Sequence, residues 1–325
     1  MTRITARLLL LTAAVSLVGV ACAAAQERYA LIVSGASGGP PYAEQYAAWA
    51  DDLGRILRER MKLAPDNVVV LDEDGNAAAQ STAANVRRSI GAVRAKMTAA
   101  DLLLVVLIGH GTFDGTDAKF NLVGPDLESA EWAALLDALP GRLVSVNTAS
   151  AGFPFLQKLA GPRRVVISAT DNPAQRYDTV FPQFFIHALA DPASDIDKNG
   201  RISIWEAFGA AASSVRRYYQ RQGQLATERA LLDDTGDGVG HEPGESSDDG
   251  TIASTIYLDV PDPGAPPTDD VLVQLLQRRA ALESELEDLR IRKQFLPVPE
   301  YQKEFERIMV ALAKVQREIR DRRGS

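Results

Sequence analysis

Apolar residues in this chain fall into short, dense runs separated by segments in which they recur at helical spacing. The densest run, Leu102 to Ile108, contains no polar residue, which is typical of a strand buried on both faces of a sheet. Between Tyr42 and Ile56 the apolar side chains recur every three or four residues, which predicts an amphipathic helix. Strands that alternate with helices in this way predict an α/β fold, with a mostly parallel sheet covered by helices on both faces.

The same patterns continue along residues 27–260. Further strands are predicted over residues 29–34, 67–71, 143–146 and 164–169, with a hairpin near 120–123 and a last strand over 252–260. Further helices are predicted over residues 86–97, 132–139, 153–159, 181–189 and 204–219. We therefore expect one α/β domain over this whole segment.

The pattern changes after residue 260. Residues 261–268 are rich in proline, which predicts a linker. Beyond them, residues 269–321 carry apolar side chains at spacings of three and four with Glu, Lys and Arg between them, and Pro297 interrupts the pattern. A helical hairpin or coiled coil is therefore predicted. Two roles stay open for it: it stabilises the chain by folding back on itself, or it mediates self-association or docking.

The first 25 residues predict a secretory signal peptide. Arg3 and Arg7 precede an apolar run from Leu8 to Val20, and small residues follow up to Gln26. This run is short for a membrane span, and no other stretch of the sequence has the length and hydropathy of one. We therefore expect a periplasmic or secreted protein without a transmembrane segment after cleavage. Lipid attachment at Cys22 is the alternative.

Charge and cysteine content narrow the chemistry further. The formal net charge is −8, and loss of the signal peptide, whose charged residues are Arg3 and Arg7, makes it more negative by two. An acidic protein repels a phosphate backbone, so nucleic acid is not expected as a partner. Cys22 is the only cysteine, so a chain cleaved before Gln26 has no thiol for a disulfide, a metal site or a nucleophile. Clustered carboxylates instead suggest a bound cation.

The buried run 102–108 ends in a histidine between two glycines. In a parallel α/β sheet, the loop that leaves the C-terminal end of a strand is where chemistry is usually placed, and His110 therefore stands where a catalytic base would stand. Residues 109–115 (Gly-His-Gly-Thr-Phe-Asp-Gly) resemble the His-Gly motif of caspase-fold peptidases, in particular legumain-like ones. The resemblance implies a caspase-like fold over residues 29–260. Strand 164–169 resembles the strand that follows the nucleophile in those enzymes.

The nucleophile of the family is replaced in this chain. Those enzymes carry a strand ending in Asp- or Glu-Ala-Cys-x-Ser-Gly, and residues 143–152 occupy the same place, with Ala149 at the cysteine position. A methyl group cannot attack a carbonyl, so cysteine peptidase activity is not expected. His110 then remains as a vestigial histidine of the dyad. Ser150 is the alternative nucleophile, but no acid is evident in the sequence to orient His110.

Residues 195–206 (Asp-Ile-Asp-Lys-Asn-Gly-Arg-Ile-Ser-Ile-Trp-Glu) match the twelve-residue calcium loop of EF-hands at every informative position. Oxygen ligands are expected at positions one, three, five, seven, nine and twelve, and Gly200 permits the sharp turn at position six. These six ligands are Asp195, Asp197, Asn199, the backbone carbonyl of Arg201, Ser203 and Glu206. The sequence therefore predicts a Ca²⁺ site.

A second acidic segment resembles the first in part. Asp233, Thr235 and Asp237 match positions one, three and five of the same loop, which makes them weaker metal-ligand candidates. Position twelve falls on a glycine, so the closing carboxylate either is missing or comes from Glu242 or Glu245. A flexible acidic loop without a cation is the other interpretation.

Together these features predict a secreted, calcium-binding, caspase- or legumain-like pseudopeptidase. We expect it to act as a binding or scaffold protein for an unidentified protein or peptide ligand, with self-association through residues 269–321 as a further expectation. The alternative is an active peptidase or esterase that uses Ser150 with His110.

Overall fold

The computed structural model describes residues 26–260, 270–293 and 296–323. The predicted signal peptide, residues 1–25, and the predicted linker, residues 261–268, lie outside these ranges. No helix in the described ranges is both long enough and apolar enough to cross a membrane.

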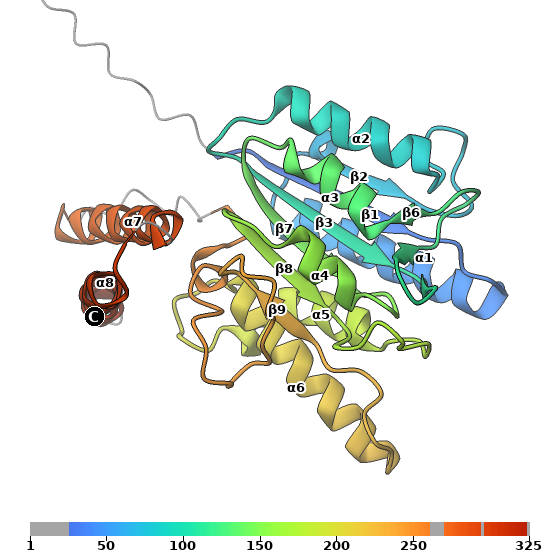
Figure 1. Cartoon of the computed structure of the whole chain (residues 1–325). Helices are drawn as coiled ribbons and strands as arrows, with labels where there is room; N and C mark the ends of the chain where they lie inside the picture. The colour runs from blue at the N-terminus through green and yellow to red at the C-terminus, as the bar shows by residue number, and fades with distance from the viewer. Residues whose placement is uncertain (1–25, 261–269, 294–295, 324–325) are drawn as a thin grey trace, which may run out of the picture.

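A six-stranded sheet forms the centre of the α/β part (Figure 1), in the order β2-β1-β3-β7-β8-β9. Neighbouring strands run parallel except β8 and β9, which are antiparallel. The strands are β1 (Arg28–Ser34), β2 (Val68–Leu71), β3 (Leu102–Ile108), β7 (Arg142–Asn147), β8 (Arg164–Ser168) and β9 (Leu231–Asp233). The predicted mostly parallel α/β architecture is therefore confirmed.

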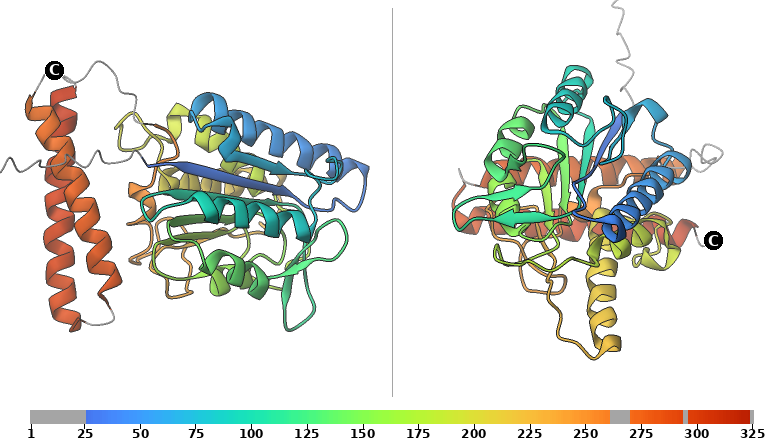
Figure 2. Two further views of the ribbon diagram at one scale, coloured as in Figure 1. Left: turned by 90° about the horizontal axis from the view of Figure 1, so that it is seen from above. Right: turned by 90° about the vertical axis from the view of Figure 1, so that its right-hand side faces the viewer.

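Helices cover both faces of this sheet (Figure 2). Alternate residues of β1 point to opposite faces: Ala30 and Ile32 pack on the side of α1, α5 and α6, whereas Leu31 and Val33 pack on the side of α2, α3 and α4. The helices are α1 (Pro40–Arg55), α2 (Ala83–Lys96), α3 (Ser129–Asp137), α4 (Phe153–Leu159), α5 (Phe181–Ala190) and α6 (Ile204–Gln222), with short turns η1 (Ile56–Arg60), η2 (Pro65–Asn67), η3 (Pro192–Ser194) and η4 (Ala253–Thr255). Burial on both faces explains why β3 is an unbroken apolar run.

A small antiparallel sheet follows β3 and lines part of the candidate site. It consists of β4 (Gly111–Phe113), β5 (Ala118–Phe120) and β6 (Leu127–Glu128). The turn of its first hairpin lies between Phe113 and Ala118, so the hairpin starts earlier in the chain than the sequence pattern predicts. β4 lies at one edge of this sheet.

The predicted last strand over residues 252–260 is wrong. That segment contains the turn η4 and a single bridge between Tyr257 and Ser203, while the strand that completes the sheet is the three-residue β9. The side chain of Asp234 accepts a hydrogen bond from the backbone N–H of Ala253 at 2.8 Å, which holds the segment in a turn. Apolar residues in the segment are buried by side-chain packing without joining the ladder.

Two long helices, α7 (Asp270–Ile291) and α8 (Val298–Arg323), follow the α/β part and lie side by side in both views (Figures 1 and 2). Leu286, Leu289, Tyr301 and Ile308 form one buried cluster between them, and Leu282, Val315 and Ile319 form another. The helical content predicted for residues 269–321 is thus present, with the break near Pro297. Whether this pair takes part in self-association stays a prediction.

Candidate functional site

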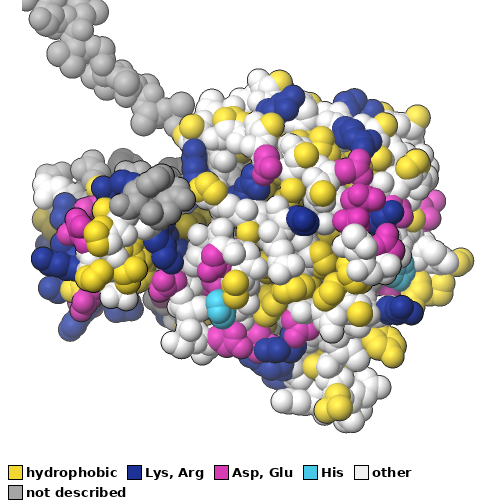
Figure 3. All heavy atoms as spheres, viewed as in Figure 1, with side chains coloured by type: hydrophobic (Ala, Val, Ile, Leu, Met, Phe, Trp, Pro, Cys, Tyr) yellow, Lys and Arg dark blue, Asp and Glu magenta, His cyan; other side chains and the backbone are white. Residues whose placement is uncertain are grey.

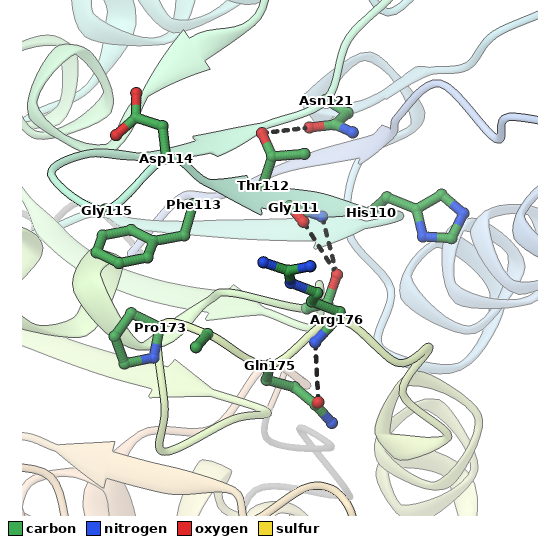
Figure 4. A pocket seen from close by; sticks show the side chains of 12 residues that line it. His110, Gly111, Thr112, Phe113, Asp114, Gly115, Asn121, Pro173, Gln175 and Arg176 are labelled. Atoms are coloured by element: carbon green, nitrogen blue, oxygen red, sulfur yellow. Dashed lines mark hydrogen bonds between the residues drawn. The ribbon is translucent and has the colours of Figure 1, made fainter.

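The C-terminal ends of the parallel strands meet at one edge of the sheet, where a cavity of about 610 Å³ opens. Figure 4 shows β4 and the loop that follows it on one side, with Gln175 and Arg176 from the loop between β8 and α5 on the other. Parallel strands place the loops that follow them together, which explains why residues far apart in the sequence line one cavity. The cavity is lined by residues 110–115, Asn121, Ser150 and residues 173–176.

Gly111 shows why glycine must follow the histidine. A Cβ atom at this position would lie 2.1 Å from the carbonyl oxygen of Ser150, which is too close for any side chain. The loop after β3 and the turn after β7 are therefore in direct backbone contact. This contact fixes the relative positions of His110 and the turn from Ala149 to Gly152.

The hydroxyl of Ser150 is committed to this same contact. Its Oγ donates a hydrogen bond to the carbonyl oxygen of Gly111 at 3.1 Å and accepts one from the N–H of Gly111 at 3.2 Å. Among the described residues, Ser150 has no hydrogen bond to His110. The histidine and the alternative nucleophile lie on one cavity, but the proton that a base would remove points at a backbone carbonyl.

Ala149 lies beneath the cavity and does not line it. It is 1% exposed and belongs to the hydrophobic cluster on the α2, α3 and α4 side of the sheet. Its N–H donates to Oδ1 of Asn147 at 3.0 Å. Ala149, which the family resemblance places at the position of a cysteine, is therefore part of the core.

His110 is held by groups from three separate elements. Its Nε2 lies 3.0 Å from the carbonyl oxygen of Ser37, and its Nδ1 lies 3.0 Å from Oδ1 of Asp178. The hydroxyl of Tyr46 lies 3.2 Å from Nε2 and 3.4 Å from Nδ1, and the ring of Tyr42 packs edge-on at 5.0 Å. The expectation that no acid orients His110 is wrong, because the fold brings Asp178 to it from a loop that is distant in sequence.

The partners of His110 restrict what it can do. A backbone carbonyl and a carboxylate both accept hydrogen bonds only, so each ring nitrogen binds its partner by donating a proton. While both contacts are made, neither ring nitrogen is free to take a proton from a substrate. In this arrangement His110 joins loops together and is not placed as a general base.

A buried carboxylate that the sequence did not identify holds the loop carrying Asp178. Glu228 accepts hydrogen bonds from the N–H groups of Val180 and Phe181 at the start of α5, and from the hydroxyl of Tyr219. Burial raises the pKa of Glu228 to about 7 and the pKa of Tyr219 to about 12. Sequence position gave no signal for this role, because Glu228 stands in an irregular segment between α6 and β9.

The predicted calcium loop brings three carboxylates together. Ligand oxygens of Asp195, Asp197 and Glu206 lie within 4.8 Å of one another. Burial and the neighbouring carboxylates raise the pKa of Asp197. Such convergence of hard oxygen ligands suits a divalent cation, so these residues fit Ca²⁺.

Backbone geometry supports this loop. Gly200 has φ of 86°, which favours glycine at the turn, and its N–H donates to the carboxylate of Asp195 at 2.9 Å. Glu206 caps the start of α6 together with Ser203 and also accepts from the N–H groups of Ile196 and Asp197. The closing carboxylate is thus positioned by the helix that follows the loop.

The remaining predicted ligands lie on the same loop. Asn199 accepts a hydrogen bond from the N–H of Arg201 at 2.8 Å and donates from Nδ2 to the hydroxyl of Tyr257 at 3.0 Å. The side chain of Arg201 pairs with Asp259 at 2.8 Å and lies over the ring of Tyr257. Tyr257 and Asp259, in the segment after η4, therefore hold the loop through contacts with Asn199 and Arg201.

The second acidic loop is closed by a residue that the sequence spacing did not indicate. Asp249 accepts hydrogen bonds from the N–H groups of Asp234 and Thr235, as Glu206 does from positions two and three of the first loop. Glu242 and Glu245 instead pair with Arg229. Figure 3 shows acidic side chains gathered on the loops near β9, close to basic ones.

The acids of this second loop accept hydrogen bonds within the loop, as those of the first loop do, and one of them also pairs with a histidine. Asp233 accepts from the N–H groups of Gly236 and Gly238 at 2.7 and 2.9 Å, and the second oxygen of Asp249 lies 2.6 Å from Nδ1 of His241. Hydrogen bonding to Asp249 raises the pKa of His241. The carboxylate of Asp237 accepts from the N–H of Val239 at 2.8 Å. One oxygen of Asp249 is therefore paired with His241, and the other accepts from backbone N–H groups of the loop.

No family model and no curated protein matches this chain. Among solved structures, it is similar to protein GSU0716 from Geobacter sulfurreducens, with 16% sequence identity and a TM-score of 0.44. The match covers 67% of this chain and 98% of that chain. A likeness this distant carries no argument about the site, whose chemistry follows from its own residues.

Proposed function

We propose that this chain is a calcium-binding pseudopeptidase of caspase-like, legumain-like fold that binds a peptide or protein ligand without cleaving it. The order of elements supports the fold assignment: β3 leads into the His-Gly loop, and β7 is followed by helix α4 and strand β8, as the resemblance implies. The predicted signal peptide supports a periplasmic or secreted location for this function.

One observation carries the proposal of a non-catalytic cavity. The groups that could perform acyl transfer are held by internal contacts. Ser150 makes hydrogen bonds with both backbone groups of Gly111, and His110 makes a hydrogen bond with Ser37 and an ion-pair contact with Asp178. Nucleophilic catalysis needs the base within hydrogen-bonding reach of the nucleophile, and this contact is missing among the described residues. The cavity of about 610 Å³ nevertheless has the size of a ligand site.

Calcium at Asp195, Asp197, Asn199, Arg201, Ser203 and Glu206 forms the second half of the proposal. Three carboxylates within 4.8 Å of one another support it. When bound, the cation would hold the loop before α6 in its turned form. The second loop, with Asp233, Thr235 and Asp237, is the weaker candidate because Asp249 is paired with His241.

The alternative function is hydrolysis of peptides or esters by Ser150 with His110. It requires Ser150 to release both hydrogen bonds to Gly111 and to turn toward the ring. The one observation that favours it is that both residues line the same cavity.

Incubation with a mixed peptide library and with a fluorophosphonate distinguishes the two functions. We expect no cleavage by the wild-type protein and no label at Ser150. Cleavage that is abolished equally by Ser150→Ala and His110→Ala would overturn the proposal. Binding is then measured with the same peptides in the wild type and in Arg176→Ala, since the Arg176 side chain lines the cavity.

A further inference from the structure

His110 lies where three elements that shape the cavity meet. Ser37 comes from the loop between β1 and α1, Tyr46 from α1, and Asp178 from the loop between β8 and α5. The last of these loops also supplies Arg176 to the cavity wall. One imidazole therefore connects segments that are distant from one another in the sequence.

The charge state of the ring decides which of these contacts form. Because Ser37 offers a carbonyl and Asp178 a carboxylate, only the doubly protonated ring satisfies both at 3.0 Å. A neutral ring has one nitrogen without a proton, and that nitrogen can accept only from the hydroxyl of Tyr46, 3.2 to 3.4 Å away. When the ring loses a proton, one of its nitrogens can no longer donate to Ser37 or Asp178 and can instead accept a hydrogen bond from the hydroxyl of Tyr46.

We propose that His110 is a proton-operated clamp, which when protonated ties the Asp178 loop to the Ser37 loop and closes the cavity wall, and when neutral releases one of them. The sign follows from linkage: the closed form holds one more proton than the released form, so lowering the pH favours closure. Imidazoles change charge between about pH 5 and 8, which sets the range to examine.

The other charged and titratable groups facing the ring are consistent with this exchange. On α1, burial strongly raises the pKa of Tyr46, so its hydroxyl keeps its proton as a donor. The hydrogen bond to Asp178 raises the pKa of Tyr42, so the hydroxyl of Tyr42 also keeps its proton as a donor. From the opposite wall Arg176 lines the cavity, and the carboxylate of Glu73 holds the N–H of Ser37 at 3.1 Å.

The test uses the full chain without any ligand. Hydrogen exchange of peptides covering residues 36–39 and 171–180 is measured from pH 5 to 8, corrected for the intrinsic pH dependence of exchange, together with the NMR titration of the His110 ring. We expect exchange in at least one of the two segments to slow by about three- to tenfold as the ring gains its proton. This range corresponds to the strength of a charge-assisted hydrogen bond that solvent weakens, because both side chains are partly exposed.

Matched variants make the result specific. Asp178→Asn and His110→Gln should remove the pH-dependent part of the protection, whereas His187→Gln, whose side chain is 75% exposed on α5, should keep it. Protection that does not change with pH in the wild type, or that persists in His110→Gln, overturns the clamp. An effect of pH on peptide affinity would also require the proposed binding function, but the exchange measurement does not, so the two can fail separately.

Discussion

The cavity at His110 and the loop from Asp195 to Glu206 both place polar side chains at the end of an element, yet they differ in the kind of groups that these side chains bring together. In the cavity, Ser150 and His110 use their hydrogen-bonding capacity on neighbouring backbone and side chains. In the loop, three carboxylates converge, with ligand oxygens within 4.8 Å of one another. Converging acceptors of like charge favour a cation, whereas mutually satisfied donors and acceptors favour a fixed shape.

The largest effect expected on the cavity side comes from Glu228. Its pKa is raised from 4.5 to about 7, so the folded chain holds its proton more tightly than the unfolded chain does. This group therefore stabilises fully below pH 4.5, and its contribution is lost as the pH rises through about 7. We expect the free energy of unfolding to fall by up to about 3 kcal/mol over this range relative to Glu228→Gln. Denaturant unfolding of both proteins at several pH values measures the difference, and parallel pH profiles would contradict it.

The second prediction concerns calcium binding by the loop from Asp195 to Glu206. If only the native state binds the ion, a hundredfold excess over its dissociation constant stabilises the fold by about 2.7 kcal/mol. The melting temperature of the wild type should then rise by several degrees relative to chelator, Asp195→Asn should lose this rise, and Asp237→Asn should keep it. If Asp237→Asn lost the rise in melting temperature and Asp195→Asn kept it, the cation would bind to the second loop instead.

The third prediction tests whether the backbone contact between Gly111 and Ser150 fixes the shape of the cavity. Gly111→Ala places a Cβ against the carbonyl of Ser150 at 2.1 Å, so either the β3 loop or the β7 turn must move. We expect a loss of about 2 kcal/mol in denaturant unfolding. Gly91→Ala, on α2 with no atom within 4 Å of the added carbon, is the matched control and should be neutral or stabilising. Equal stability of both variants would show that the contact is not tight.

Ser150→Ala should have the smallest effect. The substitution removes both hydrogen bonds to Gly111 and leaves its backbone groups without that partner, which costs about 1 kcal/mol of stability. Calorimetric unfolding measures this loss. An unchanged melting temperature would mean that the hydroxyl is not engaged structurally, which would strengthen the case for the hydrolase.

The sequence predicted the architecture well because buried runs and helical spacing are local signals. The strand at Leu102–Ile108 and the helix at Phe153–Leu159 match the structure at both ends. The last strand was misplaced because β9 has three residues, too few to show a pattern, while apolar residues after Gly250 are buried in a turn. Burial alone does not distinguish a strand from a packed turn.

The sequence by itself determined the residue types on which the proposals depend: a histidine between glycines, an alanine where the family resemblance predicts a cysteine, and oxygen ligands at calcium-loop spacing. Only the tertiary structure decided their partners. Asp178 contacts His110, Glu228 contacts α5, and Asp249 closes the second acidic loop. Each is far from its partner in the sequence, so the sequence pattern does not predict the contact. For Asp178 the physical reason is that a parallel sheet gathers the loops from one end of its strands. For Glu228 and Asp249 it is the packing of segments that no local pattern relates to their partners.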